Sequence, residues 1–334
     1  MTAKDSFRLA AIQAAPIYFD REASTEKACS LIREAGAMGA TVAAFGETWL
    51  PGYHFFIFGK TQPQTFNALA EYLANAVEIP SPTTENLCAT AKAAGLDVVI
   101  GIVERDRTTQ GTVYCTLLFI GRNGQILGRH RKLKPTFAER AAWGEGDAQG
   151  LRVYERPYAR ISGLNCWEHN MMLPGYALAA QGTQIHVAAW TGREPPEAPP
   201  AQVPLWSRQL LLSRAFASQA ACYVIAVGGV RRLGDMPQRY MELSRFENTG
   251  DSYIIDPRGE VIAGPAQGEI ILTADGSMEA VRAAKAVVDI GGHYSRPDIL
   301  RLVIDRRLPE RISDTPFNKE TSNTSPETIG MRQP

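Results

Sequence analysis

The stretch RISGLNCWEHNMMLPGYALAAQGTQIHVAAW, residues 160–190, decides the fold class of this chain. Residues 160–166 form a run of strand length, and residues 184–190 form another. Between them, residues 174–182 begin with proline and consist mostly of small and apolar helix-compatible residues. A strand, a short helix and a second strand in succession are typical of an α/β domain.

The same alternation extends over most of the chain. Further strands are predicted at residues 8–16, 41–47, 97–105, 113–121, 125–133, 223–229, 251–264 and 269–275, with a turn at 257–259 inside the range 251–264. Further helices are predicted around 28–35 and at 205–221 and 278–289. The Asn123-Gly124 pair is a hairpin signal, so some neighbouring strands must be antiparallel. We therefore predict one α/β domain at residues 1–312, with mixed sheets covered by helices, and a polar, disordered tail at residues 313–334.

Composition and cysteine usage exclude several classes of protein. The 334 residues are 45% apolar and 21% charged, and the formal net charge of zero argues against a nucleic-acid partner. The five cysteines are widely spaced without a CxxC pair, which is typical of a reduced, cytoplasmic protein and not of a zinc ribbon. The N-terminal residues lack the apolar core of a signal peptide, and no apolar run is long enough to span a bilayer, so we expect no membrane contact.

Three reactive side chains fall at the ends of predicted strands. Glu47 and Cys166 each end a strand, and Lys132 lies near the end of a third. Catalytic groups in α/β folds usually lie at strand ends, where a rigid frame holds them at a crevice. A carboxylate can take the proton of a thiol, and a lysine stabilises thiolate and developing negative charge. The three residues therefore form an acyl-transfer set that needs neither a metal nor a cofactor.

Each of these residues also has a purely structural interpretation. Cysteine is commonly buried and inert, and we expect this of the other four cysteines, which are Cys29, Cys88, Cys115 and Cys222. Pattern alone leaves Cys166 open between a nucleophile and an inert thiol. His130 and His169 are expected to be hydrogen-bonded or surface residues. A cysteine–histidine protease would need one of them to face Cys166.

Longer motifs around the three residues resemble a known family. The segments FGETWLPGY at 45–53, HRKLKPTFAERAAWGEGD at 130–147 and LNCWEH at 164–169 resemble the nitrilase branch of the carbon–nitrogen hydrolase superfamily, in that family's order. The segment GHYSRPDIL at 292–300 is similar to the C-terminal segment of nitrilases. The resemblance covers residues 7–305, nearly the whole predicted domain.

The resemblance implies a four-layer α-β-β-α sandwich and a role for each motif residue. Cys166 matches the nucleophile, Glu47 the general base, and Lys132 the residue that stabilises charge. Glu139 matches a second glutamate that orients the substrate and holds the lysine. The implied reaction hydrolyses a nitrile to a carboxylic acid and ammonia through a covalent thioimidate and thioester, without a cofactor or metal.

The substrate pocket is less determined than the catalytic set. We predict that three residues contact the substrate: Tyr53, Trp167 and Trp190. The rings of Tyr53 and Trp190 would form an apolar wall. Trp167 would also offer its backbone N–H. Two departures from the family pattern bear on this pocket: Gly46 stands where proline usually precedes the glutamate, and His54 begins an unusual run after PGY. The identity of the nitrile therefore stays open.

Two alternative functions and one kind of partner complete the expectations. An amidase or carbamoylase of the same superfamily would use the same residues, whereas a non-catalytic assembly protein on this fold would be expected to lack one of the four. The segments 174–182 and 205–221 are apolar around much of their circumference, so they need burial on more than one face. We expect a homo-oligomer, a dimer or a larger spiral, and a small nitrile as the other partner.

Overall fold

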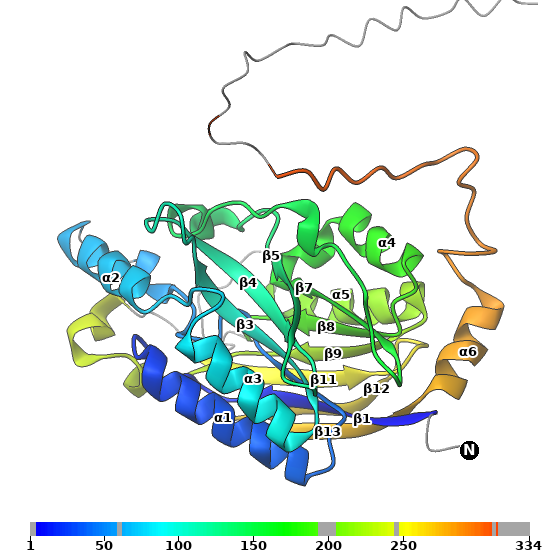
Figure 1. Ribbon diagram of the computed structural model, residues 1–334, viewed down its shortest axis with the longest axis horizontal. Helices are drawn as coiled ribbons and strands as arrows, with labels where there is room; N and C mark the ends of the chain where they lie inside the picture. The colour runs from blue at the N-terminus through cyan, green and yellow to red at the C-terminus, as the bar shows by residue number, and fades with distance from the viewer. Residues whose placement is uncertain (1–4, 59–61, 193–204, 244–246, 309–311, 313–334) are drawn as a thin grey trace, which may run out of the picture.

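Two β-sheets packed face to face form the centre of the protein (Figure 1). The computed structural model describes residues 5–58, 62–192, 205–243, 247–308 and 312. The six-stranded sheet has the order β13-β1-β2-β3-β4-β5. Its strands are β1 (Ser6–Gln13), β2 (Val42–Phe45), β3 (Asp97–Arg105), β4 (Val113–Ile120), β5 (Ile126–Arg131) and β13 (Ile270–Ser277).

The second sheet has seven strands in the order β10-β11-β9-β8-β7-β6, with β12 paired to β11. They are β6 (Tyr154–Glu155), β7 (Arg160–Asn165), β8 (Ile185–Ala189), β9 (Tyr223–Val227), β10 (Val230–Arg231), β11 (Asn248–Ile255) and β12 (Val261–Gln267). Strands β7, β8 and β9 are parallel, and so are β1, β2 and β3 in the other sheet. Antiparallel strands flank both parallel sets, which confirms the predicted mixed sheets.

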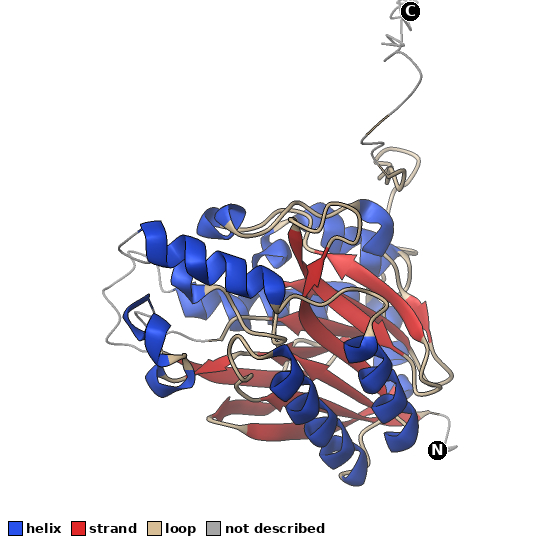
Figure 2. Cartoon of the chain, turned by 60° about the vertical axis from the view of Figure 1, so that its left-hand side comes forward, coloured by secondary structure: helices blue, strands red, loops and turns tan. Residues whose placement is uncertain are grey.

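Helices cover the outer face of each sheet, so the molecule has four layers (Figures 1 and 2). Helices α1 (Arg21–Ala37) and α3 (Pro82–Ala94) pack on the six-stranded sheet. Helices α4 (Met172–Ala180) and α5 (Leu205–Ala220) pack on the seven-stranded sheet. Helix α2 (Gln62–Ala74) covers a smaller aromatic cluster, and α6 (Met278–Val287) follows β13. No helix among these combines the length and apolar content that crossing a bilayer requires.

Side-chain alternation along the strands separates the core into layers. On β1, Leu9 and Ala11 face the other sheet, whereas Ala10 and Ile12 face the helices. All four side chains are fully buried. A strand that is buried on both faces reads as a continuous apolar run, as residues 8–16 do. The four-layer sandwich is therefore the arrangement that buries such runs completely.

Several predicted boundaries were wrong in detail. The strand expected at 125–133 ends at Arg131, and that expected at 41–47 ends at Phe45, so Lys132 and Glu47 lie just beyond their strands. The chain leaves β2 because Thr48 adopts a φ of 44°, which no strand accommodates. Helix α2 was not predicted. The predicted tail at 313–334 lies outside the described residues.

One close backbone approach fixes the turn that carries Glu47. A Cβ added to Gly101 of β3 would lie 2.1 Å from the carbonyl oxygen of Gly46 and 2.5 Å from the backbone nitrogen of Thr48. A Cβ added to Gly46 would lie 3.1 Å from the carbonyl oxygen of Trp190. The glycine at position 46 therefore fits a turn held between β3 and the backbone of Trp190.

We predict that Gly101→Ala destabilises the protein by roughly 1–3 kcal/mol, because the added methyl group clashes with backbone that cannot move independently. Urea unfolding of the two proteins measures the difference. Gly234→Ala is the control, since a Cβ there meets no atom within 4 Å. Equal unfolding free energies for the two variants would contradict the close approach.

Candidate active site

Three chain segments that follow strand ends bring four buried side chains together. Glu47 follows β2, Lys132 follows β5, and Cys166 follows β7 of the other sheet. The Lys132 Nζ donates to Glu47 Oε1 at 2.8 Å and to Glu139 Oε2 at 2.6 Å. The exposed fractions of all four side chains are 5% or less. The structure therefore gathers all four residues that the motifs singled out.

Glu139 is held from three sides. It lies in the short 3-10 helix Phe137–Ala141, and the Thr136 backbone N–H donates to its Oε2 at 2.6 Å. The Tyr53 hydroxyl donates to its Oε1 at 2.7 Å. With Lys132 as the third donor, both oxygens of this carboxylate have partners. Glu139 is thus fixed as an ionic anchor for the lysine.

Burial and charge set the protonation of the cluster. Burial is the main cause that raises the pKa of Glu47 to about 7; Glu139 adds to the rise and Lys132 opposes it. Burial and then the Glu47 charge raise the pKa of the Cys166 thiol well above its ordinary value. Burial would lower the pKa of Lys132, but Glu47 and the other acidic groups outweigh it and raise that pKa. A neutral thiol therefore lies beside a carboxylate whose pKa is close to neutral pH, which suits proton transfer.

Cys166 occupies a turn with strained backbone. Its φ of 49° lies in the left-handed region that side chains other than glycine rarely adopt. The turn continues as a 3-10 helix, Cys166–Asn170. A hydrogen bond from the Trp167 backbone N–H lowers the pKa of the thiol, in opposition to burial. The turn thus presents a backbone donor at the sulfur, which is where negative charge would develop.

Glu168 ties the cysteine turn to the lysine segment. Its Oε2 accepts from the Asn165 backbone N–H at 2.8 Å, and its Oε1 accepts from the Leu133 backbone N–H at 2.8 Å. His130 Nε2 lies 3.0 Å from Oε2, and both side chains are fully buried. One carboxylate therefore spans the two sheets and sets the position of Cys166 relative to Lys132.

A chain of side chains fixes the other end of the turn. His169 Nδ1 lies 2.7 Å from the Cys166 carbonyl oxygen, and its Nε2 lies 3.0 Å from His186 Nε2. His186 Nδ1 lies 2.8 Å from Ser162 Oγ. Burial lowers the pKa of His169 to about 4 and lowers that of His186 well below its ordinary value, so both rings are neutral. Because a carbonyl only accepts, His169 donates from Nδ1, and His186 must then donate to it.

These contacts bear on the cysteine–histidine alternative. His169 contacts the Cys166 carbonyl through Nδ1, and its other ring nitrogen is engaged by His186. His130 is engaged by Glu168. His130 and His169 are both hydrogen-bonded, as expected from the sequence. As a base for Cys166, the cluster offers Glu47.

The three residues predicted to contact substrate lie in different surroundings. Tyr53 lines a narrow cavity beside Glu47 together with Phe55 and Val230. Trp167 is partly buried, and the Arg208 guanidinium lies 5.4 Å from its ring centroid. Trp190 is 2% exposed and donates from Nε1 to Ser213 Oγ.

The side chain and the backbone of Trp190 make different contacts. Its ring packs in the cluster under α5, while its carbonyl oxygen accepts from the Glu47 backbone N–H at 3.3 Å. Substrate contact by Tyr53 and Trp167 stays a prediction, and so does contact by Trp190.

Two further buried residues lie at the site: Cys115, expected from the sequence to be inert, and His54, noted there only as a departure from the family pattern near the pocket. Cys115 lies in the middle of β4, and its Sγ is 3.4 Å from Glu47 Oε1. His54 lies against the Trp143 ring with 4.3 Å between ring centroids, and neither of its ring nitrogens has a hydrogen-bond partner in the described structure. Burial lowers its pKa to about 3, so it is neutral. Only the three-dimensional arrangement places these residues beside the charged cluster.

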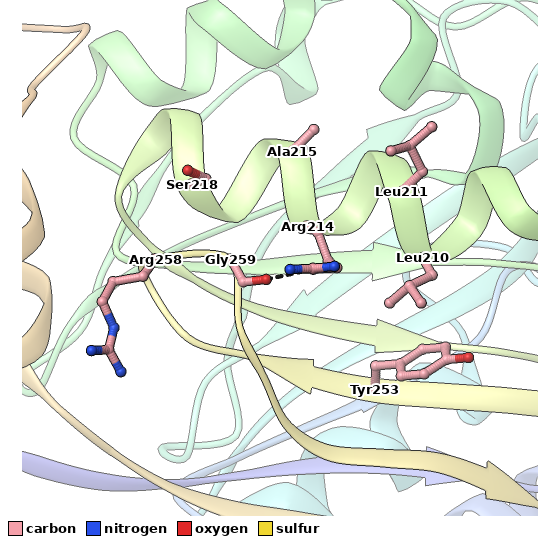
Figure 3. Close-up of a pocket in the computed structure, with 8 residues that line it drawn as sticks. All are labelled: Leu210, Leu211, Arg214, Ala215, Ser218, Tyr253, Arg258 and Gly259. Carbon is pink, nitrogen blue, oxygen red and sulfur yellow. Dashed lines mark hydrogen bonds between the residues drawn. The ribbon is translucent and has the colours of Figure 1, made fainter.

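Other features of the surface lie apart from this cluster. A hollow of about 450 Å³ lies between α5 and the turn that joins β11 to β12 (Figure 3). Leu210, Leu211 and Ala215 line it, and Arg214 crosses it to donate to the Gly259 carbonyl at 2.7 Å. Within the described ranges, no three His, Cys, Asp or Glu side chains are placed to hold a metal ion.

Comparison with known proteins gives consistent results. A family model described as carbon-nitrogen hydrolase matches residues 8–286. The chain is 55% identical to a protein named nitrilase 2 from an unknown prokaryotic organism, over 91% of this chain and 94% of that protein. It is 36% identical to an aliphatic nitrilase of Rhodococcus rhodochrous, over 91% of this chain and 84% of that enzyme.

Solved structures share the fold at low sequence identity. The crystal structure of Saccharomyces cerevisiae Nit3, a member of branch 10 of the nitrilase superfamily, superimposes with a TM-score of 0.70 at 19% identity. The match covers 87% of this chain and 97% of that protein. It confirms the α-β-β-α sandwich that the motifs implied.

Proposed function

The chain belongs to the carbon–nitrogen hydrolase family, and on that premise we propose that it is a nitrilase, which hydrolyses a nitrile to a carboxylic acid and ammonia. The observation that carries the proposal is the buried Lys132 ammonium, which bridges Glu47 and Glu139 beside Cys166. The named nitrilases that share 55% and 36% identity support nitriles as the substrate class.

The first half of the reaction forms a covalent thioimidate. Glu47 takes the proton from the Cys166 thiol, and the sulfur attacks the nitrile carbon. The nitrile nitrogen gains negative charge as the C≡N bond becomes C=N, and it receives the proton that Glu47 holds. Lys132 stabilises this charge, because its ammonium is buried where electrostatic interactions are strong.

The second half releases ammonia and then the acid. Glu47 takes a proton from a water molecule whose oxygen adds to the thioimidate carbon, and it returns that proton to the nitrogen, which gives a tetrahedral intermediate that carries sulfur, hydroxyl and amine. Glu47 then takes the hydroxyl proton and passes it to the amine, so that ammonia leaves and a thioester remains. A second water molecule, activated in the same way, releases the carboxylic acid and restores the thiol. If sulfur leaves the tetrahedral intermediate first, an amide forms instead.

Apolar and aromatic side chains near this cluster favour an apolar nitrile over a charged one. Tyr53, Phe55 and Val230 line the cavity beside Glu47, and Trp167 lies next to the nucleophile. The five cysteines are all free, which suits a reducing compartment and a cytoplasmic location.

The experiment that tests the function compares nitriles with amides. The protein should release ammonia from members of a panel of aliphatic, aromatic and arylacetonitrile substrates, and far more slowly from the corresponding amides. The superfamily alternative, an amidase or carbamoylase, predicts the reverse order. A panel without turnover of either class would favour a non-catalytic assembly protein.

We predict that Lys132→Ala lowers kcat by at least ~10²-fold, the scale of losing one electrostatic stabiliser of the transition state. Glu47 and Glu139 would also be left buried without their cation, which costs roughly 3–5 kcal/mol of unfolding free energy. Steady-state kinetics and urea unfolding measure the two effects.

Lys134→Ala is the matched control, because this lysine is half exposed and pairs with Glu145 at the surface. Its removal should change the unfolding free energy by less than ~1 kcal/mol and leave kcat nearly unchanged. An inactive Lys134→Ala beside an active Lys132→Ala would contradict the assignment of the lysine.

The protein also assembles with a second copy through the outer face of α4 and α5. The exposed fractions of Met172, Leu173 and Leu211 on these helices are 85%, 64% and 63%, so large apolar side chains are uncovered. The hollow beside Leu211 extends this face (Figure 3). Residues 288–308 run along the outside of the body after α6, where Ile290 and Ile304 pack against the cluster under α5, and they expose Leu300 and Val303 (Figure 1). Contact between copies is the simplest way to cover such surfaces.

We predict at least a dimer by light scattering at micromolar concentration. Leu211→Glu should shift the population toward monomer, because it places a charge in the centre of the apolar face. Phe66→Glu on α2 is the control, since Phe66 is 61% exposed on a different face. A monomeric wild type, or equal effects of the two variants, would contradict this interface.

A further inference from the structure

The two oxygens of the Glu47 carboxylate are in different surroundings. Oε1 accepts from Lys132 Nζ at 2.8 Å and also lies 3.4 Å from the sulfur of Cys115. Oε2 is buried and has no hydrogen-bond partner among the described residues. Protein donors therefore converge on one oxygen and leave the other unpaired inside the site.

Cys115 can approach this carboxylate only as a neutral thiol. A thiolate at 3.4 Å from a carboxylate oxygen would repel it, whereas an S–H group donates a weak hydrogen bond. Cys115 is 1% exposed, and burial, followed by the Glu47 charge, raises the pKa of its thiol well above the ordinary value. The contact is therefore a hydrogen bond from Cys115 Sγ to Glu47 Oε1.

Cys115 also contacts the segment that carries the lysine. Its carbonyl oxygen accepts from the Lys132 backbone N–H at 2.8 Å, directly beyond the β4–β5 register pair of Thr116 with Arg131. One residue in the middle of β4 thus holds the base through its side chain and the lysine through its backbone. The Cys115 side chain packs in the same cluster as the aromatic residues Tyr72 and Trp143.

We infer that Cys115 is a positioning residue for the reaction: its thiol and Lys132 together occupy Glu47 Oε1, so that Oε2 is the atom that takes and returns the proton of Cys166. The inference rests on the proposed function, in which Glu47 is the general base. It assigns a purpose to a cysteine that sequence analysis expected to be inert. The two cysteines differ in backbone conformation: Cys166 lies in a strained turn, whereas Cys115 lies in a regular strand.

The acid limb of the pH profile reports this contact. Glu47 acts as a base only when ionised, so kcat/KM falls as the pH drops through the pKa of Glu47, which is about 7. A donor on Oε1 favours the ionised form, so loss of the donor raises this pKa and moves the acid limb to higher pH. The ionisable groups that face Glu47, none of which the variants change, are Lys132, Glu139, Cys166, Tyr53 and Tyr72.

Three variants separate hydrogen bonding from volume. Cys115→Val removes the donor and keeps the site filled, whereas Cys115→Ser keeps a donor in a smaller side chain. The control is Cys222→Val, a fully buried cysteine in the cluster between the seven-stranded sheet and its helices. The measurement is kcat/KM for a nitrile between pH 5 and 9, with thermal unfolding of each variant for comparison.

The inference predicts that Cys115→Val moves the acid limb upward by about 0.5 pH unit, which is about a threefold loss of kcat/KM below that limb. Cys115→Ser should restore the limb to the wild-type pH or below it, and Cys222→Val should leave it in place. Superimposed limbs for wild type and Cys115→Val would overturn the inference. So would equal upward shifts in the Val and Ser variants, because volume alone would then be the cause.

A measurement without turnover covers the case in which Cys115→Val does not fold. The infrared S–H stretching band that disappears in Cys115→Ser should shift in Glu47→Gln, because the carboxylate acceptor is lost. An unmoved band would overturn the inference. Failure of the proposed function looks different: the wild type would then release no ammonia from any nitrile. A folded Glu47→Gln variant that retains nitrile turnover would instead remove Glu47 as the base, and with it the basis of the inference.

Discussion

A lysine ammonium buried between two carboxylates is the interaction on which the rest of the site depends. Removing three charges from water is costly, and only close pairing with good geometry offsets that cost. Lys132 meets this condition through hydrogen bonds of 2.8 and 2.6 Å to Glu47 and Glu139. Tyr53 donates to the other oxygen of Glu139, and the Thr136 backbone N–H donates to the same oxygen as Lys132. A buried site whose ammonium is already paired before the substrate arrives can oppose developing charge without reorganising.

The sandwich architecture supplies the nucleophile from the other sheet. Glu47 and Lys132 follow strands of the six-stranded sheet, whereas Cys166 follows β7 of the seven-stranded sheet. Glu168 bridges the two through backbone N–H groups of Asn165 and Leu133. The positive φ of Cys166 persists because this bridge and the His169 contact fix both ends of the turn. Packing between the sheets is thus a condition for the chemistry, beyond its contribution to stability.

Local patterns in the sequence were sufficient to predict the longer strands, the mixed sheets and the residues at strand ends, but not the two-residue strands β6 and β10. Apolar runs and turn signals are local, and the motifs around Glu47, Lys132 and Cys166 are long enough to identify the family. The contact between Cys115 and Glu47 could not be predicted, because it joins residues 68 positions apart across the sheet. The bridging role of Glu168 and the packing of the Trp190 ring under α5 likewise depend on how the two sheets meet. Helix α2 escaped prediction because it packs on aromatic side chains from distant segments.

The central claim is that Cys166 forms a covalent bond with the nitrile carbon. The most direct test is mass spectrometry of protein quenched during turnover of a slowly hydrolysed nitrile, with peptide mapping of all five cysteines. We expect the added mass on the peptide that contains Cys166, none on peptides that contain Cys29, Cys88, Cys115 or Cys222, and none on folded Cys166→Ala. An adduct on another cysteine, or ammonia release by folded Cys166→Ala, would contradict the account.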